Sequence, residues 1–244
     1  MTVVPECGLC KASPMRIGIM GGTGPAGSGL ALRMSVAGHQ VLIGSRSKER
    51  SEEKVAELIA QWPDHNLKIE TGTNEDAAHC DLIVVATPWD STATIVGEYA
   101  DALRGKVVIT MANALVKVGK EFQPLVPPRG SIAAHVQAEI PESRVVAAMQ
   151  HLPAKELGNL HHHVDSDVLI CSDFPEAIEI VSDLVAQIPG CRPLSTGRLS
   201  NALALEAFTA VLLQLNVRYK TRVAPRLTGI PDVDPKSGRN MKLD

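Results

Sequence analysis

The sequence predicts a protein of the α/β class, a doubly wound parallel sheet with a small C-terminal α/β lobe. Apolar strand-like segments alternate with amphipathic helical ones, which is the pattern of a parallel sheet covered by helices on both faces. The first strand runs directly into a glycine-rich turn, "GTGPAG" at residues 22–27, and a helix follows at once. The 244 residues are 45% hydrophobic, enough to bury a sizeable core.

The elements of the first half follow in order along residues 15–149. Strands are predicted at 15–20, 39–44, 67–72, 81–88, 106–111 and 143–149, where apolar runs are bounded by turn residues. Helices are predicted from the glycine turn to Gly38, over 47–62 and 74–80, from 90 to 104, and over 130–140. Residues 112–130, with three prolines, are interpreted as a long loop, either a lid or a surface excursion.

The pattern changes after residue 150. A turn-rich segment precedes strands at 167–172 and 191–197, which flank a helix at 175–188, and a strongly apolar helix follows at 200–216. We interpret 150–222 as a small lobe for substrate contacts and dimerisation, and as a candidate to extend the sheet. A helix that is apolar on more than one face is typical of a buried helix or a subunit interface, so a homodimer is expected. Residues 1–14 and 223–244 are interpreted as tails.

Charge and cysteine content exclude several classes of function. The net charge is −3 with acids and bases interspersed, so no nucleic-acid partner is expected. We see neither an apolar run of about 20 residues nor a secretory signal, and we expect a soluble cytoplasmic protein without a membrane partner. The pair Cys7 and Cys10 has no second pair at zinc-site spacing, and the "HHH" run at 161–163 has no completing ligand. Reduced thiols and no bound metal are therefore expected.

The glycine turn matches the G-x-G-x-x-G pattern of a Rossmann-type fold. Gly22 is expected to permit the tight turn, Gly24 to let a pyrophosphate approach the backbone, and Gly27 to let the helix pack closely on the strand. The free N–H groups at the helix start would face the phosphate charge. The position between a strand and a helix favours nucleotide binding over a plain connecting turn, so residues 15–149 are predicted to be a dinucleotide-binding domain.

The residues after the second strand indicate which dinucleotide binds. An acidic residue at this position would accept hydrogen bonds from the ribose 2′-hydroxyl of NAD, whereas this chain has Ser45 and Arg46, with Arg50 one helical turn later. These groups can donate to the 2′-phosphate of NADP. Two charge-assisted bonds would favour NADP by on the order of 10² to 10⁴-fold. The alternative is that these residues are only the charged, solvent-exposed start of a helix. That alternative explains Lys48, but it does not explain why position 45 is serine and not an acidic residue.

Five segments together resemble a known family, NADPH-dependent coenzyme F-420 reductase, also called F-420H2:NADP oxidoreductase. They are "RIGIMGGTGPAGSGLALRMSVAGHQVLIGSR" from residue 16, "ATPW" at 86–89, "VVAAMQHLPAKELGNL" at 145–160, "SDVLICSD" at 166–173, and "RPLSTGRLSNALALEAFTAVLLQLN" from residue 192. The resemblance covers about residues 15–220. It implies reversible hydride exchange between NADP(H) and a deazaflavin, coenzyme F-420, in a cleft between the nucleotide domain and the C-terminal lobe.

The resemblance also implies roles for individual residues. It places Thr23, Gly24, Pro25 and Ala26, flanked by Gly22 and Gly27, at the pyrophosphate, with Ser45, Arg46 and Arg50 at the 2′-phosphate. Thr87, Pro88 and Trp89 would lie beside the dinucleotide and Ala154 near the nicotinamide, while Gln150, His151, Leu152 and Pro153 would border the deazaflavin. The archaeal pattern has histidine at the position of Gln150 and a small hydroxyl residue at that of His151. This departure does not support a catalytic histidine, but His151 lies where the resemblance places the site and histidine titrates near neutral pH, so it is a candidate catalytic residue with a structural role as its alternative.

Hydride transfer between two positioned rings requires no general acid or nucleophile, because the cofactors supply the chemistry. Three basic residues of the long loop, Lys117, Lys120 and Arg129, are candidates for the phosphate and polyglutamate tail of the deazaflavin. Two other functions stay open from the sequence. One is an NADPH-dependent reductase of another acceptor, such as a flavin, a ferric chelate or an imine, and the other is a non-catalytic NADP-binding redox sensor.

Overall fold

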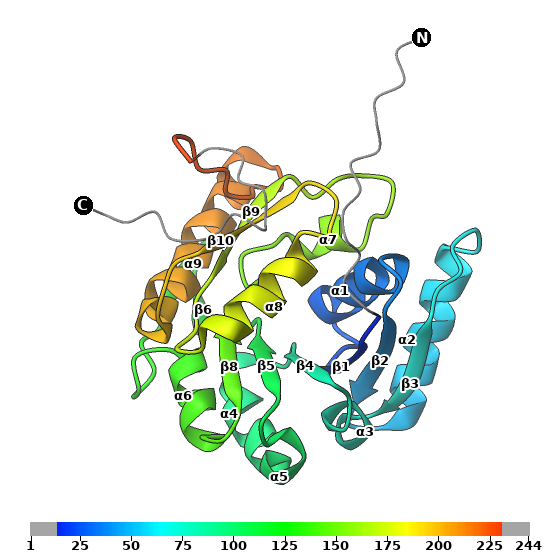
Figure 1. Ribbon diagram of the computed structural model, residues 1–244. Helices are drawn as coiled ribbons and strands as arrows, with labels where there is room; N and C mark the ends of the chain where they lie inside the picture. The colour runs from blue at the N-terminus through cyan, green and yellow to red at the C-terminus, as the bar shows by residue number, and fades with distance from the viewer. Residues whose placement is uncertain (1–13, 231–244) are drawn as a thin grey trace.

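The computed structural model describes residues 14–230 and contains the doubly wound sheet that the sequence predicts (Figure 1). Within these residues, six parallel strands form one sheet in the order β3-β2-β1-β4-β5-β8. They are β1 (Arg16–Met20), β2 (Gln40–Ser45), β3 (Ile69–Thr73), β4 (Leu82–Val85), β5 (Val107–Thr110) and β8 (Arg144–Ala147). The order reverses beside β1, so a ligand crevice is expected at the carboxyl ends of β1 and β4.

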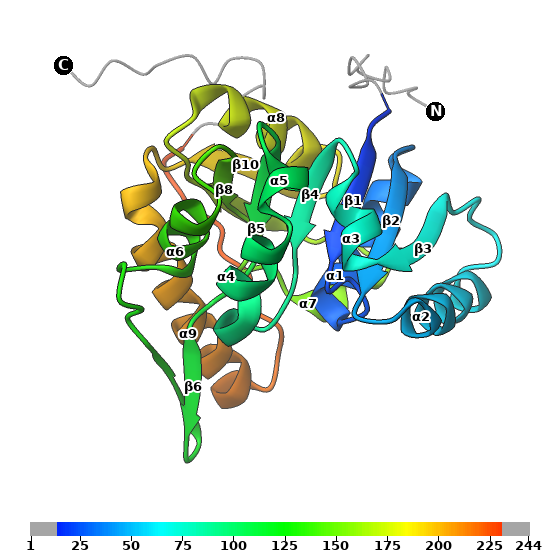
Figure 2. The same cartoon turned by 90° about the horizontal axis from the view of Figure 1, so that it is seen from below.

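Helices cover both faces of the sheet (Figures 1 and 2). One face carries α1 (Pro25–Val36), α2 (Lys48–Gln61) and α8 (Pro175–Val185), and the other carries α3 (Asn74–Ala78), α4 (Trp89–Glu98), α5 (Ala100–Leu103) and α6 (Ile132–Glu139). Side chains of β1 alternate between the two hydrophobic clusters, with Ile17 and Ile19 in one and Met20 in the other. A Cβ on Gly18 would lie 2.1 Å from the Ala77 carbonyl oxygen, so the glycine allows α3 to pack directly on the sheet.

Two expectations for the first half need correction. The helix predicted over 90–104 is two helices, α4 and α5, because Tyr99 leaves the helical backbone region at φ −116° and ψ 20°. The long loop contains an antiparallel hairpin, β6 (Leu115–Val118) and β7 (Glu121–Pro124), joined through Gly119 with φ 61°. Alternating side chains and a glycine at the turn are hairpin signals, which the nearby prolines obscured. The hairpin projects from the body of the protein (Figure 2).

The C-terminal lobe is a separate small sheet. Parallel strands β9 (Ser166–Ile170) and β10 (Cys191–Ser195) pair with each other, and this sheet meets β8 through one antiparallel bridge between Ala147 and Cys171, with N···O distances of 3.0 and 3.1 Å. The lobe therefore contacts the main sheet without extending it. The turn-rich segment holds a helical turn, α7 (Ala154–Leu157), which packs on α1. One hydrophobic cluster joins residues of both halves, and the boundary at residue 150 stays a prediction.

The last helix, α9 (Ala202–Tyr219), follows a short 3-10 turn, η1 (Leu199–Asn201). Together they form a segment long and apolar enough to cross a membrane by length and composition, which was not expected from the sequence, and 33% of its most apolar window is buried. Beyond α9, residues 223–230 lie along the lobe, where Arg192 donates to the carbonyls of Leu227 and Ile230. This part of the predicted tail is thus packed, and residues 231–244 lie outside the described part of the chain.

Candidate functional site

The glycine turn joins β1 to α1 at the carboxyl edge of the sheet, and hydrogen bonds to β2 and to the first residue of α3 fix its shape. The Gly22 N–H donates to the Gly44 carbonyl at 2.9 Å, and the Gly21 N–H donates to Asn74 Oδ1 at 3.0 Å. The left-handed residue of the turn is Gly21, with φ 69°. Gly22 is needed for a different reason, because a Cβ there would lie 2.8 Å from the Ile19 carbonyl oxygen. The contact of Asn74 with the glycine turn was not predicted, because Asn74 lies 53 residues after Gly21 and no local sequence signal connects the two.

The remaining two glycines differ in how closely the chain packs on them. A Cβ on Gly27 would lie 2.8 Å from the Gly22 Cα, so only glycine allows α1 to approach the turn this closely. A Cβ on Gly24 would meet only the Gly21 carbonyl oxygen, at 3.9 Å, and this side of the turn is open. Gly24 caps α1 and Pro25 occupies its first turn, so the next N–H groups, on Ala26 and Gly27, have no acceptor within the helix. An open helix start with free N–H groups fits a pyrophosphate.

The predicted 2′-phosphate residues lie together at the end of β2. Ser45 is the last residue of the strand and is buried, whereas Arg46 and Arg50 are exposed at the start of α2. Neither arginine has an ion-pair partner among residues 14–230, whereas the neighbouring Lys48 lies 3.9 Å from Glu52. A hydroxyl and two unengaged guanidinium groups form a donor set suited to a phosphate monoester.

The other predicted dinucleotide residues are distributed over two places. Ala154 begins α7 and lines a cavity together with Thr23 and Pro25, so it lies close to the glycine turn. Trp89 begins α4 and lines a different cavity, of about 480 Å³, between α4 and α6. Directly before Trp89 on the chain, Thr87 is buried with its Oγ1 2.9 Å from Thr92 Oγ1, and Pro88 is exposed.

Three polar groups at the carboxyl ends of β5 and β8 are buried and unpaired. Both amide atoms of Gln150 lack a hydrogen-bond partner in the described structure, and so does Oδ1 of Asn113. The two residues are neighbours, since Asn113 Nδ2 donates to the Gln150 carbonyl at 2.8 Å. A buried polar atom without a partner costs about 1–3 kcal/mol, which is why native proteins contain few of them. These unpaired amide atoms are suited to form hydrogen bonds with the polar edge of a bound ring system. Asn113 was not predicted, and its only signal was its position directly after β5.

His151 is held inside the protein by the backbone of β9. Its Nε2 lies 3.0 Å from the Asp167 carbonyl and 3.2 Å from the Leu169 amide nitrogen, and the side chain is 3% exposed. Burial lowers the pKa of His151 to about 4, so the imidazole is neutral at neutral pH. Its Nδ1 is buried and has no hydrogen-bond partner in the described structure, so the choice between a structural and a catalytic role stays a prediction. His151 fixes the turn that carries Leu152, which is buried, and Pro153, which caps α7.

Arg33 is a buried cation that was not predicted. It lies in the last turn of α1, is 4% exposed, and donates to four carbonyl oxygens of α7 and the segment that follows it, at distances from 2.6 to 3.0 Å. These acceptors are the carbonyls of Glu156, Leu157, Asn159 and His162. The available signal was an arginine inside the apolar stretch "LALRMSV". Arg33 therefore ties the segment that carries Ala154 to the helix that begins at the glycine turn.

Two buried carboxylates have opposite surroundings. Asp167 is fully buried, but hydrogen bonds from Arg192 and the Leu227 N–H outweigh the effect of burial and hold its pKa below the usual range. Glu206 of α9 accepts from the N–H groups of Ile132 and Ala133 at 2.9 and 3.0 Å, and burial raises its pKa to about 7. Glu206 thereby caps α6, and the hint in the sequence was an acid in the apolar stretch "ALALEAFTAVLL".

The described part of the chain contains no cluster of side chains that could bind a metal ion. No group of three or more histidine, cysteine or acidic side chains there could hold a metal ion. Cys80, Cys171 and Cys191 are free thiols. The Cys7 and Cys10 pair lies outside the described residues.

Comparisons with known proteins agree with this site. Residues 16–114 match the family model described as NADP oxidoreductase coenzyme F420-dependent. The chain is 37% identical over 213 residues to the F420-dependent NADP reductase of Methanocaldococcus jannaschii, covering 85% of this chain and 95% of that one. It is 33% identical over 233 residues to the reductase of the same name from Methanothermobacter thermautotrophicus, with coverages of 92% and 99%.

A solved structure and a partial relative complete these comparisons. The solved structure, from Arthrobacter sp. FB24, shares the fold with a TM-score of 0.73 at 23% identity, covering 86% of this chain and all of that one. A metalloreductase of Rattus norvegicus is 29% identical over 203 residues, which is 83% of this chain but 38% of the rat protein. Because full-length relatives exceed 30% identity, the chain belongs to the family of F420-dependent NADP reductases.

Proposed function

We propose that this protein transfers a hydride reversibly between NADP(H) and the deazaflavin coenzyme F420. The observation that carries the proposal is the glycine turn with an open side at Gly24, followed at the end of β2 by Arg46 and Arg50 without acidic partners in the described chain. A pyrophosphate and a 2′-phosphate are the two anionic groups of NADP, and they suit these two places. The names of the archaeal relatives supply the second substrate.

The residues of this chain would bind, orient and enclose the reactants. The nicotinamide, when bound, donates or accepts the hydride. Thr23 to Ala26 would hold the pyrophosphate, while Ser45, Arg46 and Arg50 would hold the 2′-phosphate. The unpaired amides of Gln150 and Asn113 would bond to a polar ring edge and fix its orientation. His151, neutral and bonded to β9, positions this turn and need not move a proton.

Anaerobic mixing tests the proposal. The protein is mixed with NADPH and the oxidised deazaflavin, and the visible absorbance of the deazaflavin is followed, with NADH and riboflavin as controls. Bleaching with NADPH, and much slower bleaching with NADH, is expected. Tight NADPH binding without bleaching by any acceptor would contradict the proposal and favour a redox sensor.

A second acceptor class deserves a direct comparison in the same assay. A protein named metalloreductase is similar to 83% of this chain, and one fold can serve the reduction of different acceptors. A ferric chelate is therefore included at equal concentration. The proposal predicts that kcat/KM for the deazaflavin exceeds that for the chelate by at least about 100-fold, since a positioned ring pair lowers the entropic barrier. A ratio near one would favour a general NADPH-dependent reductase.

We further propose that two copies of the chain associate through α9 and the hairpin. Val211, Val217 and Tyr219 of α9 are 52%, 51% and 66% exposed, and Val118 of the hairpin is 52% exposed. A two-stranded hairpin has little stability by itself in water, so a second copy would also support β6 and β7. Sedimentation equilibrium is expected to give twice the chain mass, and Val211→Lys with Val217→Lys to give the monomer mass. A wild-type monomer at 10-fold higher concentration would contradict the homodimer.

A further inference from the structure

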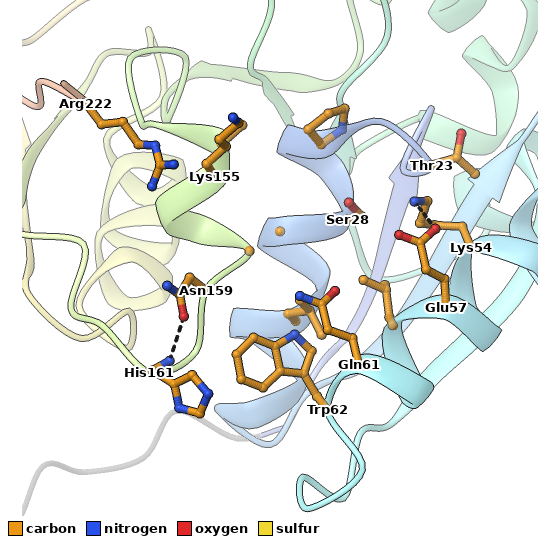
Figure 3. Close-up of a pocket in the computed structure, with 16 residues that line it drawn as sticks. Thr23, Ser28, Lys54, Glu57, Gln61, Trp62, Lys155, Asn159, His161 and Arg222 are labelled. Carbon is orange, nitrogen blue, oxygen red and sulfur yellow. Dashed lines mark hydrogen bonds and ion pairs between the residues drawn. The ribbon is translucent and has the colours of Figure 1, made fainter. Parts of the chain in front are cut away.

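A cavity of about 670 Å³ runs along the outer surface of α1, and beyond Thr23, Pro25 and Ala154 its lining has no role in the proposed hydride transfer (Figure 3). We call it the α1 groove. Its floor is one face of α1, formed by Pro25, Ser28, Gly29 and Leu32. The spacing of these residues places them on one side of the helix over roughly 10 Å. Small side chains in the middle of this floor keep the groove deep.

The two walls of the α1 groove come from distant parts of the chain. One wall is α2, with Lys54 and Glu57, and the other is the segment from Ala154 through α7 to His161, with Arg222 beside it (Figure 3). One end of the groove is at Thr23 and Ala154, which border the glycine turn. The other end is at Trp62 and His161, whose rings meet edge to face at 4.8 Å. The groove therefore begins at the reaction site and leads away from it.

Hydrogen-bond donors dominate this lining. Lys155 is exposed and has no acidic partner among the described residues, and Arg222 forms an ion pair with Glu156 at the rim. Lys54 forms an ion pair with Glu57 on the opposite wall. Of the four charged residues in the lining, three are cations and one is an acid, so the groove has an excess of positive charge. A ligand rich in anionic oxygens suits such a surface.

Trp62 independently indicates that the α1 groove binds a ligand with a hydrogen-bond acceptor. Its side chain is 7% exposed and lines the groove, and its buried Nε1–H has no hydrogen-bond partner in the described structure. Indole nitrogens that are buried usually find an acceptor, because an unpaired donor costs free energy. An oxygen atom of a bound ligand at the closed end of the groove would satisfy this donor.

We propose that the α1 groove binds the anionic arm of the deazaflavin, its phosphodiester and carboxylates, with Lys155, Arg222 and the Trp62 N–H as donors. The inference rests on the proposed function, because it takes the deazaflavin as the second substrate. The segment Gln150–Pro153, expected beside the deazaflavin ring, leads directly into Ala154 at the mouth of the groove. An arm that leaves the ring there would enter the groove at Ala154, on the wall that α7 forms.

This assignment replaces the earlier candidates on the hairpin. Lys117 and Lys120 lie on exposed β6 and its turn, and the Lys117 ammonium is 6.0 Å from the Phe122 ring centroid. Arg129 lines a separate cavity with Ser131 and Asp173. None of these three lines the α1 groove, so they serve as matched controls for charge.

The experiment compares two deazaflavins in steady-state oxidation of NADPH. One has the phosphodiester and oligoglutamate arm, and the other has the same ring with a bare hydroxylated chain. The wild-type KM is expected to be about tenfold lower for the substrate with the arm. Lys155→Gln with Arg222→Gln should remove most of this preference by raising the KM of the arm-bearing substrate alone. Lys117→Gln with Lys120→Gln should keep the preference, because the same charge is removed elsewhere.

A free oligo-γ-glutamate distinguishes an arm site from a site for separate anions. It should inhibit competitively against the arm-bearing substrate and leave the bare-chain substrate unaffected. Equal wild-type KM values for both deazaflavins would overturn the inference, as would equal inhibition of both or an equal effect of the hairpin variant. Oxidation of NADPH by the bare-chain deazaflavin establishes hydride transfer independently, so failure of the groove and failure of the proposed function give different results.

Discussion

The arginines at the carboxyl edge of the sheet and two arginines that hold segments of the C-terminal half in place, Arg33 and Arg192, have opposite surroundings. Arg46 and Arg50 are exposed and have no ion-pair partner among residues 14–230. Arg33 and Arg192 are mostly buried, and each makes several hydrogen bonds to carbonyls or to a carboxylate. A cation that the fold already satisfies holds segments together, whereas an exposed cation beside an open turn is free to bind a ligand. Removing the first kind should therefore cost stability and removing the second kind affinity.

The largest expected effect comes from Arg192. Its guanidinium makes two bonds of 2.8 Å to Asp167, whose side chain is fully buried. Arg192→Gln leaves a buried carboxylate with weaker compensation, so a loss of about 3–5 kcal/mol in the free energy of unfolding is expected in urea. Arg104→Gln is the control, because Arg104 also contacts two acids but its side chain is 56% exposed. Its loss should be much smaller, because solvent-exposed ion pairs contribute little to stability, and equal losses would remove the distinction.

The second largest effect is expected for Arg33→Gln, a loss of about 3 kcal/mol in the free energy of unfolding. Arg33→Gln leaves most of its four carbonyl acceptors buried without a donor. Arg33→Lys should give an intermediate loss, because an ammonium keeps the charge but lacks the planar fork. Thermal and urea unfolding measure both. If the lysine variant were as stable as wild type, charge alone and not the fork would hold the segment after α7.

Glu206 and Asp167 should make stability depend on pH in opposite directions. The pKa of Glu206 is raised to about 7 from 4.5, so the folded protein holds a proton that the unfolded chain loses. This contribution is fully present below about pH 4.5 and is lost as pH rises through about 7, a change of up to about 3 kcal/mol. Asp167, with a lowered pKa, contributes above the pKa of the unfolded chain and loses its contribution in acid.

Glu206→Gln tests this difference directly. The amide keeps an oxygen acceptor for α6 but cannot ionise. Urea unfolding at a series of pH values should therefore show a flatter profile between about pH 4.5 and 7.5 than the wild type. An unchanged slope would mean that another group titrates there. The acid limb below about pH 4 should remain, because Asp167 is unaltered.

The smallest effect in free energy is expected for Arg46. Arg46→Ala should weaken NADP binding about tenfold, or about 1.4 kcal/mol, and spare NAD, with less than about 0.5 kcal/mol change in unfolding. Titration calorimetry with both nucleotides measures this. Lys48→Ala is the control, since Lys48 lies near Glu52 and on the same helix start. Equal loss for both nucleotides would contradict the 2′-phosphate assignment.

Most local features of the fold were predictable. The six strands of the main sheet and the helices that begin at Pro25 and Lys48 lie within a few residues of their predicted positions. The α1 helix ends at Val36, and Gly38 with φ 103° follows as expected of a C-terminal glycine. The hairpin was missed although its signals are local, because its prolines outweighed the alternation of Val116 and Val118.

The sequence by itself determined the doubly wound fold, the glycine turn and the cations after β2, because periodicity and turn chemistry act over a few neighbouring residues. Only the tertiary structure decided which polar groups are satisfied. Arg33 meets carbonyls more than 120 residues away, and Glu206 meets an N–H group 74 residues away. The unpaired amides of Gln150 and Asn113 and the α1 groove likewise arise between distant segments. Burial and pairing depend on which surfaces meet, and a linear pattern does not contain that information.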